Sequence, residues 1–116
     1  MDGIKVLCVE NHPEHMATLQ CMLEGIGCEV MPATNAVEAL DLLANQAVDG
    51  ILLEDNLPGA CSSEVRIQMK IIRPDIPIFL FTGVGRQTPF MVRFFDAYLR
   101  RREQIGDIPE NVDREL

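Results

Sequence analysis

The sequence predicts an α/β protein with a doubly wound, five-stranded parallel sheet and helices on both faces. Three observations carry this prediction. Short apolar runs of strand length alternate with segments of helical periodicity, the connections are short, and proline or glycine stands at several boundaries. Parallel strands need crossover connections, which are right-handed, so five such alternations favour a parallel sheet.

The expected strands are short apolar runs, several of them rich in β-branched residues. They cover residues 4–9, 28–31, 50–53, 76–81 and 97–99. The natural doubly wound order for five strands is 2-1-3-4-5, the flavodoxin-like arrangement. This order brings the carboxyl ends of the first, third and fourth strands together in one cleft.

The expected helices follow from apolar spacing and from their boundary residues. Pro13 suits the first turn of a helix that Gly27 ends, and Thr34 or Asn35 can cap a helix through residue 44. A third helix opens at residue 62 and ends before Pro74, because proline restrains the residue that precedes it. A short helix over residues 89–95 and a last one over 108–116 complete the pattern.

Length and composition bound the class of protein. A chain of 116 residues fits one domain, residues 1–116, and 47% hydrophobic with 24% charged residues is ordinary for a globular protein. The apolar runs are too short to span a bilayer, and the first residues lack the basic flank of a signal peptide, so we expect a cytoplasmic protein without membrane contact. The four cysteines have no zinc-site spacing and are expected to be reduced and mostly buried.

The charge is acidic and unevenly distributed. A net charge of −8 disfavours direct binding of nucleic acid, which rests on cationic contacts to phosphates. Residues 1–64 carry eleven acids against Lys5 alone, a net of −10, whereas residues 65–116 carry nine bases against seven acids, a net of +2. The arginines of the second part, including Arg86, Arg93 and residues 100–102, either offer a basic face to an acidic partner or are simply solvated.

Polar side chains follow the predicted strands at the edge where the cleft should lie. Glu10 and Asn11 follow the first strand, Glu54 and Asp55 the third, and Thr82 the fourth. Charge at the end of a buried strand is costly unless it is used, and ligand sites of open α/β sheets lie at this edge.

The segment VDGILLEDNLPG, residues 48–59, resembles the phosphoacceptor strand of the receiver domain of two-component response regulators. In that family an Asp stands four residues before the proline; here Glu54 stands four residues before Pro58. Glu10 and Asn11 fall where receivers carry an acidic pair, and Thr82 falls at the Ser/Thr switch position. Tyr98 matches the aromatic switch position.

The departures from the family pattern concern phosphotransfer. The resemblance implies an Asp nucleophile, a divalent metal on acidic ligands, a hydroxyl and a Lys. Magnesium prefers anionic oxygen ligands in octahedral geometry, and Asn11 offers a neutral amide instead. Arg101 stands at the Lys position, where a planar guanidinium suits a standing ion pair with Glu54 better than a transferred phosphoryl group.

These changes predict a pseudo-receiver, a signalling module that works without phosphorylation and through protein–protein contacts with a sensor kinase, an output protein or another signalling protein. We expect no enzymatic activity, no cofactor and at best weak Mg²⁺ binding at the vestigial positions Glu10, Asn11 and Glu54. Two alternatives stay open: phosphorylation shifted to Asp55, and a structural scaffold without a signalling role.

Two other sites are disfavoured by the residues. His12 and His15 are three positions apart near Glu10, but no further metal ligand has a fixed spacing to them, so solvated histidines are expected. A flavin site needs a loop rich in hydroxyl groups and glycine after the first strand, and ENHPEH supplies acids and imidazoles instead.

Overall fold

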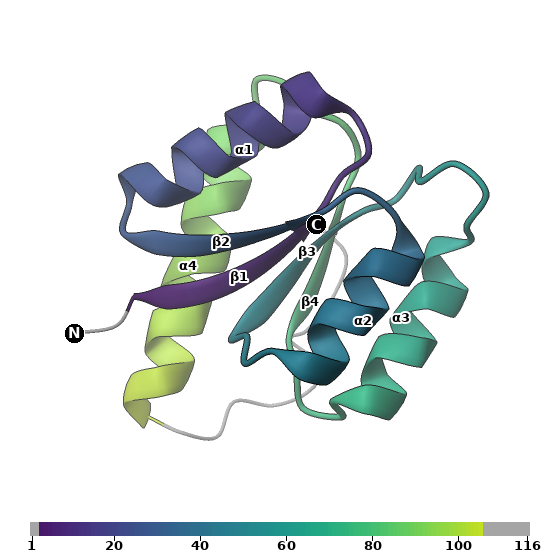
Figure 1. The fold of residues 1–116 in the computed structure, drawn as a ribbon. Helices are drawn as coiled ribbons and strands as arrows, with labels where there is room; N and C mark the ends of the chain where they lie inside the picture. The colour runs from purple at the N-terminus through teal and green to yellow at the C-terminus, as the bar shows by residue number, and fades with distance from the viewer. Residues whose placement is uncertain (1–2, 106–116) are drawn as a thin grey trace.

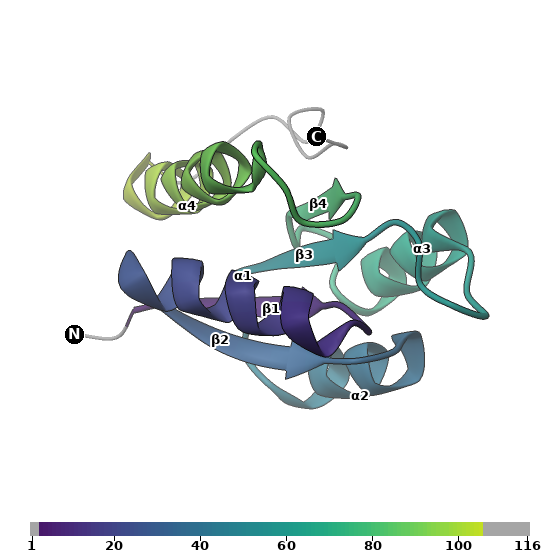
Figure 2. The ribbon, with the colours of Figure 1, turned by 90° about the horizontal axis from the view of Figure 1, so that it is seen from above.

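The computed structural model describes residues 3–105, with side chains as far as Arg102, and it has three layers (Figures 1 and 2). Four parallel strands form one sheet in the order β2-β1-β3-β4. They are β1 (Ile4–Val9), β2 (Cys28–Ala33), β3 (Gly50–Glu54) and β4 (Ile78–Phe81). The helices are α1 (Pro13–Gly25), α2 (Ala36–Asn45), α3 (Ser62–Ile72) and α4 (Thr88–Ile105).

The two faces of the sheet have separate hydrophobic clusters. Side chains alternate along each strand, so Cys8 and Leu52 face α1 and α4, while Val9 and Leu53 face α2 and α3. Figure 2 shows these two pairs of helices on opposite sides of the sheet. The predicted class, an α/β parallel sheet covered on both faces, is confirmed.

The prediction of a fifth strand over residues 97–99 is wrong. These residues lie inside α4, an 18-residue helix that also contains the predicted short helix. Val92, Phe95 and Leu99 are buried at helical spacing against β1 and β3, and no glycine or proline interrupts residues 90–105. An apolar run of three residues is compatible with a strand or with a helix, and here the longer helical pattern around it decides for the helix. Among the described residues, β4 is therefore an edge strand. The predicted helix 108–116 lies outside the described residues.

The start of α2 is fixed as the sequence predicts. The Asn35 side chain accepts a hydrogen bond from the Glu38 N–H at 2.8 Å, and the Glu38 carboxylate accepts one from the Thr34 N–H at 2.6 Å. This reciprocal arrangement satisfies backbone donors that the first helical turn leaves unpaired. Of the two candidate caps, Asn35 is the one used.

Polar contacts hold α4 against the amino end of the sheet. The Arg100 guanidinium donates to the Ile26 carbonyl at 3.0 Å and to Asp96 Oδ1 at 2.9 Å. The Cys28 thiol donates to the same Asp96 oxygen at 3.3 Å. Arg102 donates to the Asp75 carbonyl. Two arginines of the run 100–102 are thus committed to structure rather than free in solvent.

No helix among the described residues combines the length and the apolar character needed to cross a bilayer. All four cysteines are free: Cys8 and Cys28 are buried, while Cys21 and Cys61 are exposed. The expectation that most of the thiols are buried applies to only two of them.

Candidate functional site

The carboxyl edge of the sheet places Glu10 and Glu54 side by side. Val9 pairs with Leu53 in the parallel register of β1 and β3, so the next residues, Glu10 and Glu54, are neighbours on the α1/α4 side. Both side chains are buried, with exposed fractions of 2% and 4%. A pair of buried carboxyl groups thus lies at the sheet edge where the cleft was predicted.

Glu54 ties two loops together at this edge. Its Oε1 accepts a hydrogen bond from the Asn56 N–H at 3.2 Å, and its Oε2 accepts one from the Gly83 N–H at 2.9 Å. Asn56 belongs to the turn after β3, and Gly83 belongs to the loop after β4. Gly83 has φ 67°, a left-handed conformation that glycine adopts without steric cost and that presents its N–H here.

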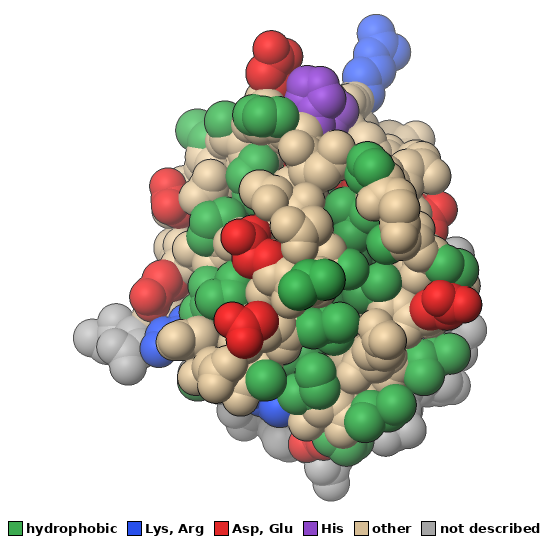
Figure 3. All heavy atoms as spheres, turned by 45° about the vertical axis from the view of Figure 1, so that its right-hand side comes forward, with side chains coloured by type: hydrophobic (Ala, Val, Ile, Leu, Met, Phe, Trp, Pro, Cys, Tyr) green, Lys and Arg blue, Asp and Glu red, His purple; other side chains and the backbone are tan. Residues whose placement is uncertain are grey.

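Glu10 is held less completely. Its Oε2 accepts a hydrogen bond from the His12 N–H at 2.9 Å, but its Oε1 is buried without a hydrogen-bond partner. Nδ1 of His15 lies 3.7 Å from that Oε1, which is an ion-pair distance when the imidazole is protonated. The rings of His12 and His15 stack with centroids 4.3 Å apart; the histidines are purple at the top of Figure 3.

Burial raises the pKa of the Glu54 carboxyl above its ordinary value. The hydrogen bonds from Gly83 and Asn56 oppose this shift because they favour the charged form, and the nearby Glu10 carboxyl raises the pKa further. Two neighbouring buried carboxylates repel each other when both are charged. The pair therefore favours a proton on Glu54 over a wider pH range than an isolated glutamate has.

The remaining cleft residues point elsewhere. Asp55 leaves the strand on the opposite side from Glu54, as strand alternation predicts, and its Oδ1 accepts a hydrogen bond from the Ser62 hydroxyl at 2.5 Å. Asn11 and Thr82 are exposed. The oxygens of Glu54 are already bonded to backbone N–H groups, so Glu10 Oε1 is the open acidic ligand of the pair.

This donor set does not fit a magnesium site. Mg²⁺ requires several oxygen ligands in near-ideal octahedral geometry. Within residues 3–102, no group of three or more acidic, histidine or cysteine side chains is arranged to hold a metal ion. In this range the cleft offers a cation the carboxyl groups of Glu10 and Glu54, with Glu10 Oε1 as the open oxygen.

Two expected members of the site lie away from it. Arg101 is exposed on α4, and Glu54 has the Asn56 and Gly83 amides as its partners, so the expected Glu54–Arg101 ion pair is wrong. The error follows from the missing fifth strand, which was to bring Arg101 to the carboxyl edge. Tyr98 is buried, but it packs from α4 on Phe79, with ring centroids 5.4 Å apart.

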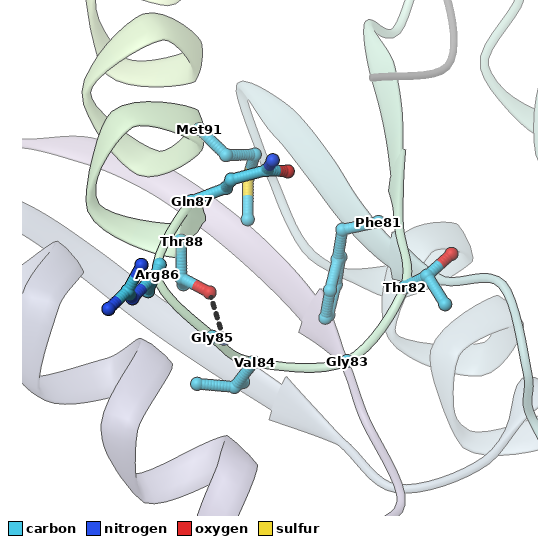
Figure 4. Close-up of a pocket in the computed structure, with 9 residues that line it drawn as sticks. All are labelled: Phe81, Thr82, Gly83, Val84, Gly85, Arg86, Gln87, Thr88 and Met91. Carbon is cyan, nitrogen blue, oxygen red and sulfur yellow. Dashed lines mark hydrogen bonds between the residues drawn. The ribbon is translucent and has the colours of Figure 1, made fainter.

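A pocket beside the cleft was not predicted. It lies between the end of β4 and the start of α4, has a volume of about 480 Å³, and is lined by Phe81, Thr82, Gly83, Val84, Gly85, Arg86, Gln87, Thr88 and Met91. Figure 4 shows the side chains of Gln87, in the turn before α4, and Met91, on α4, reaching toward Phe81, while Thr82 points away from the pocket. The Thr88 hydroxyl accepts a hydrogen bond from the Gly85 N–H at 2.8 Å and closes the loop. The signal for this loop was GVGRQTP, in which glycine, threonine and proline cluster.

Comparison with known proteins places the fold and the family. The chain is 27% identical over 81 residues to sporulation initiation phosphotransferase F of Bacillus subtilis, covering 70% of this chain and 65% of that protein. It is 34% identical over 101 residues to the sensor histidine kinase AruS of Pseudomonas aeruginosa, covering 84% of this chain and 10% of the kinase. The chain spans less than a fifth of the length of several curated relatives, this kinase among them.

Solved structures agree on the fold. A CheY-like receiver domain protein from Methanospirillum hungatei superposes with a TM-score of 0.80 at 18% identity, covering 90% of this chain and all of the other. At that identity the likeness concerns the fold alone. Residues 6–100 match the family model of the response regulator receiver domain, which is most of the chain. The chain therefore belongs to the response regulator receiver domain family.

Proposed function

We propose that the chain is a receiver module of two-component signalling that acts without phosphorylation, through contacts with other signalling proteins. One observation carries the proposal. Glu54 stands at the acceptor position, is only 4% exposed, and has both carboxylate oxygens bonded to backbone N–H groups, those of Asn56 and Gly83. Through these two hydrogen bonds Glu54 joins the loop after β3 to the loop after β4 without a phosphoryl group.

The same geometry opposes phosphotransfer to Glu54. A carboxylate becomes an acyl phosphate only when one of its oxygens is free to attack phosphorus. Attack by Glu54 would break a backbone hydrogen bond in a buried site, and Glu10 adds negative charge beside an anionic phosphodonor. Divalent metal offsets such charge in phosphoryl transfer, but the donor set of this cleft supports weak magnesium binding at best.

Asp55 is the rival acceptor, because its side chain is exposed. Its Oδ1 is engaged by the Ser62 hydroxyl, and it faces α3 rather than the carboxyl pair. These contacts favour a structural role for Asp55 at the start of α3. Sensor kinases and output proteins are the partners that membership of this family suggests for such a module. A scaffold role without signalling is the weaker candidate, because burying two carboxyl groups is costly and a scaffold has no use for them.

The test is exposure to a small phosphodonor. The purified chain is incubated with acetyl phosphate and MgCl₂, and its intact mass is recorded before and after any acyl phosphate is cleaved with hydroxylamine. We expect no gain of phosphate. The matched control is the double variant Glu54→Asp with Asn11→Asp, which restores the acidic pattern of the family and shows whether the fold can accept phosphate when the cleft allows it.

Each result has a definite reading. A labile phosphate on the unmodified chain contradicts the proposal, and peptide mapping then decides between Glu54 and Asp55. If the phosphate maps to Asp55 and disappears in Asp55→Asn, the rival acceptor is established. No uptake by the unmodified chain, with uptake by the double variant, supports the proposal directly.

A further inference from the structure

The outer surface of α4 carries an exposed row of side chains at the spacing that helix pairs use. We call Phe90, Phe94, Ala97 and Arg101 the α4 stripe; they follow each other at intervals of four, three and four residues. All four are exposed, and Phe90 and Phe94 are 74% and 53% exposed. Alternation of three and four residues keeps one row of side chains facing a second helix along its length.

The exposed part of this stripe does not contribute to packing of the core. Phe94 rests one edge of its ring near Phe79 on β4, with centroids 5.8 Å apart, and leaves about half of its surface in solvent. The inward side of α4 is filled by other residues, Val92, Phe95 and Leu99 among them. Two large aromatic side chains next to each other on the outside of one helix mark an interaction surface.

Charge distinguishes the possible occupants of the stripe. Arg86, Arg93 and Arg101 are exposed on and beside it. Asp96 is the acidic residue among the described side chains of α4, and it is turned inward to Cys28 and Arg100. A second copy packed through this stripe about a twofold axis would bring two sets of arginines together, and like charges in an interface are unfavourable.

We propose that the α4 stripe docks an amphipathic helix of a partner protein, with apolar residues on its contact row and acidic residues beside them. The proposal rests on the proposed function, because it names the kind of contact through which the module signals. The wider surface supports the choice, since residues 1–64 carry a net charge of −10. Acidic side chains are scattered over the face drawn in Figure 3. An acidic helix is repelled there and attracted to the arginines of α4.

The pocket of about 480 Å³ extends this surface at the start of α4. Gln87 lines the pocket from the turn before α4, three residues before Phe90, so the pocket lies at the end of the helix where the stripe begins (Figure 4). Phe81, Val84 and Met91 give it apolar walls. A large apolar side chain at one end of the docked helix fits this place, as anchors of helix-in-groove complexes do.

The probes are two synthetic amphipathic helices, about three heptads long, with Leu on the contact row and either Glu or Lys at the flanking positions. Each is labelled and titrated with the full chain, and binding is followed by fluorescence anisotropy. We expect the Glu helix to bind, with an affinity that falls as salt is raised, and the Lys helix not to bind. Phe90→Ser and Arg93→Glu should each weaken binding about tenfold. Val37→Ser, which removes a 79% exposed apolar residue from α2, should leave it unchanged.

Four results would overturn the assignment, with folding of each variant checked by circular dichroism. Absence of binding by the Glu helix, or equal binding of both helices, removes the acidic partner. Equal affinity of Phe90→Ser and Val37→Ser moves the site away from α4. Self-association that Phe90→Ser abolishes assigns the stripe to a second copy. Phosphate uptake is measured separately, so phosphorylation of the chain with binding of the Glu helix intact refutes the proposed function alone.

Discussion

Gly50 tests whether α4 lies where the structure places it. It is the first residue of β3 and is buried under α4. A Cβ added at Gly50 would lie 2.8 and 2.9 Å from the two methyl carbons of Leu99 and 3.0 Å from Cζ of Phe95. Contacts this short force the side chains of α4 to move. The stability of Gly50→Ala therefore reports whether α4 lies over Gly50.

The size of the effect follows from two opposing contributions. Overpacking a well-filled core costs about 1–3 kcal/mol. Alanine in place of glycine restricts the unfolded chain and returns about 0.4–1 kcal/mol. The clashing atoms are the ends of side chains rather than backbone, which favours the lower part of the range. An overpacking cost of about 1–2 kcal/mol less this return leaves a net loss of about 0.5–1.5 kcal/mol in the free energy of unfolding. Each kcal/mol lost should lower Tm by about 4–8 °C.

A double-mutant cycle separates this clash from a general loss of packing. Leu99→Ala alone should cost about 2–4 kcal/mol, because it removes a buried side chain and leaves a cavity. The added methyl group of Gly50→Ala partly fills that cavity, so in the Leu99→Ala background it should cost nothing or stabilise. The coupling energy is then about 1–2 kcal/mol, measured by urea unfolding of the four proteins.

The control is Gly25→Ala at the end of α1, where an added Cβ meets nothing within 4 Å. It should leave stability unchanged or raise it. The reasoning is refuted if Gly50→Ala and Leu99→Ala add without coupling. That result is expected if Leu99 lies on a fifth strand beside β4, because β4 would then separate it from Gly50 on β3.

Two further results follow from the titratable groups. Because the pKa of Glu54 is raised in the folded state, the folded chain holds this proton more tightly than the unfolded chain, and stability must fall as pH rises from the ordinary value of 4.5 through the raised one. Glu54→Gln should lose that part of the pH dependence of Tm, and parallel profiles of the two proteins would contradict it. Burial raises the pKa of the Cys8 and Cys28 thiols to about 12. A thiol reagent at neutral pH should therefore label the two exposed cysteines and leave Cys8 and Cys28 unmodified until the chain is unfolded in urea. Fast labelling of all four cysteines in the folded chain would exclude the buried placement.

The residues at the carboxyl edge could be predicted largely from where the strands end and from the alternation of side chains along them. The register that places Glu10 beside Glu54 follows from two apolar runs that end in acids, because parallel strands end at a common edge. The opposite direction of Asp55 follows from the alternation of side chains along a strand. The sequence could not show that the Gly83 N–H occupies a Glu54 oxygen, because that bond joins residues 29 positions apart through a loop conformation.

The sequence by itself therefore determined the fold class, most of the element boundaries and the residues at the carboxyl edge, because each depends on periodicities that neighbouring residues set. Tertiary structure alone decided the fate of residues 97–99. Ala97, Tyr98 and Leu99 suit a strand or a helix locally, and the choice depends on the space available over β1 and β3, where Phe95 and Leu99 pack against the sheet. Because these residues are helical, Arg101 lies on α4 and not at the carboxyl edge of the sheet. Phe90 and Phe94 are exposed because a helix on one side of a sheet cannot bury all of its faces.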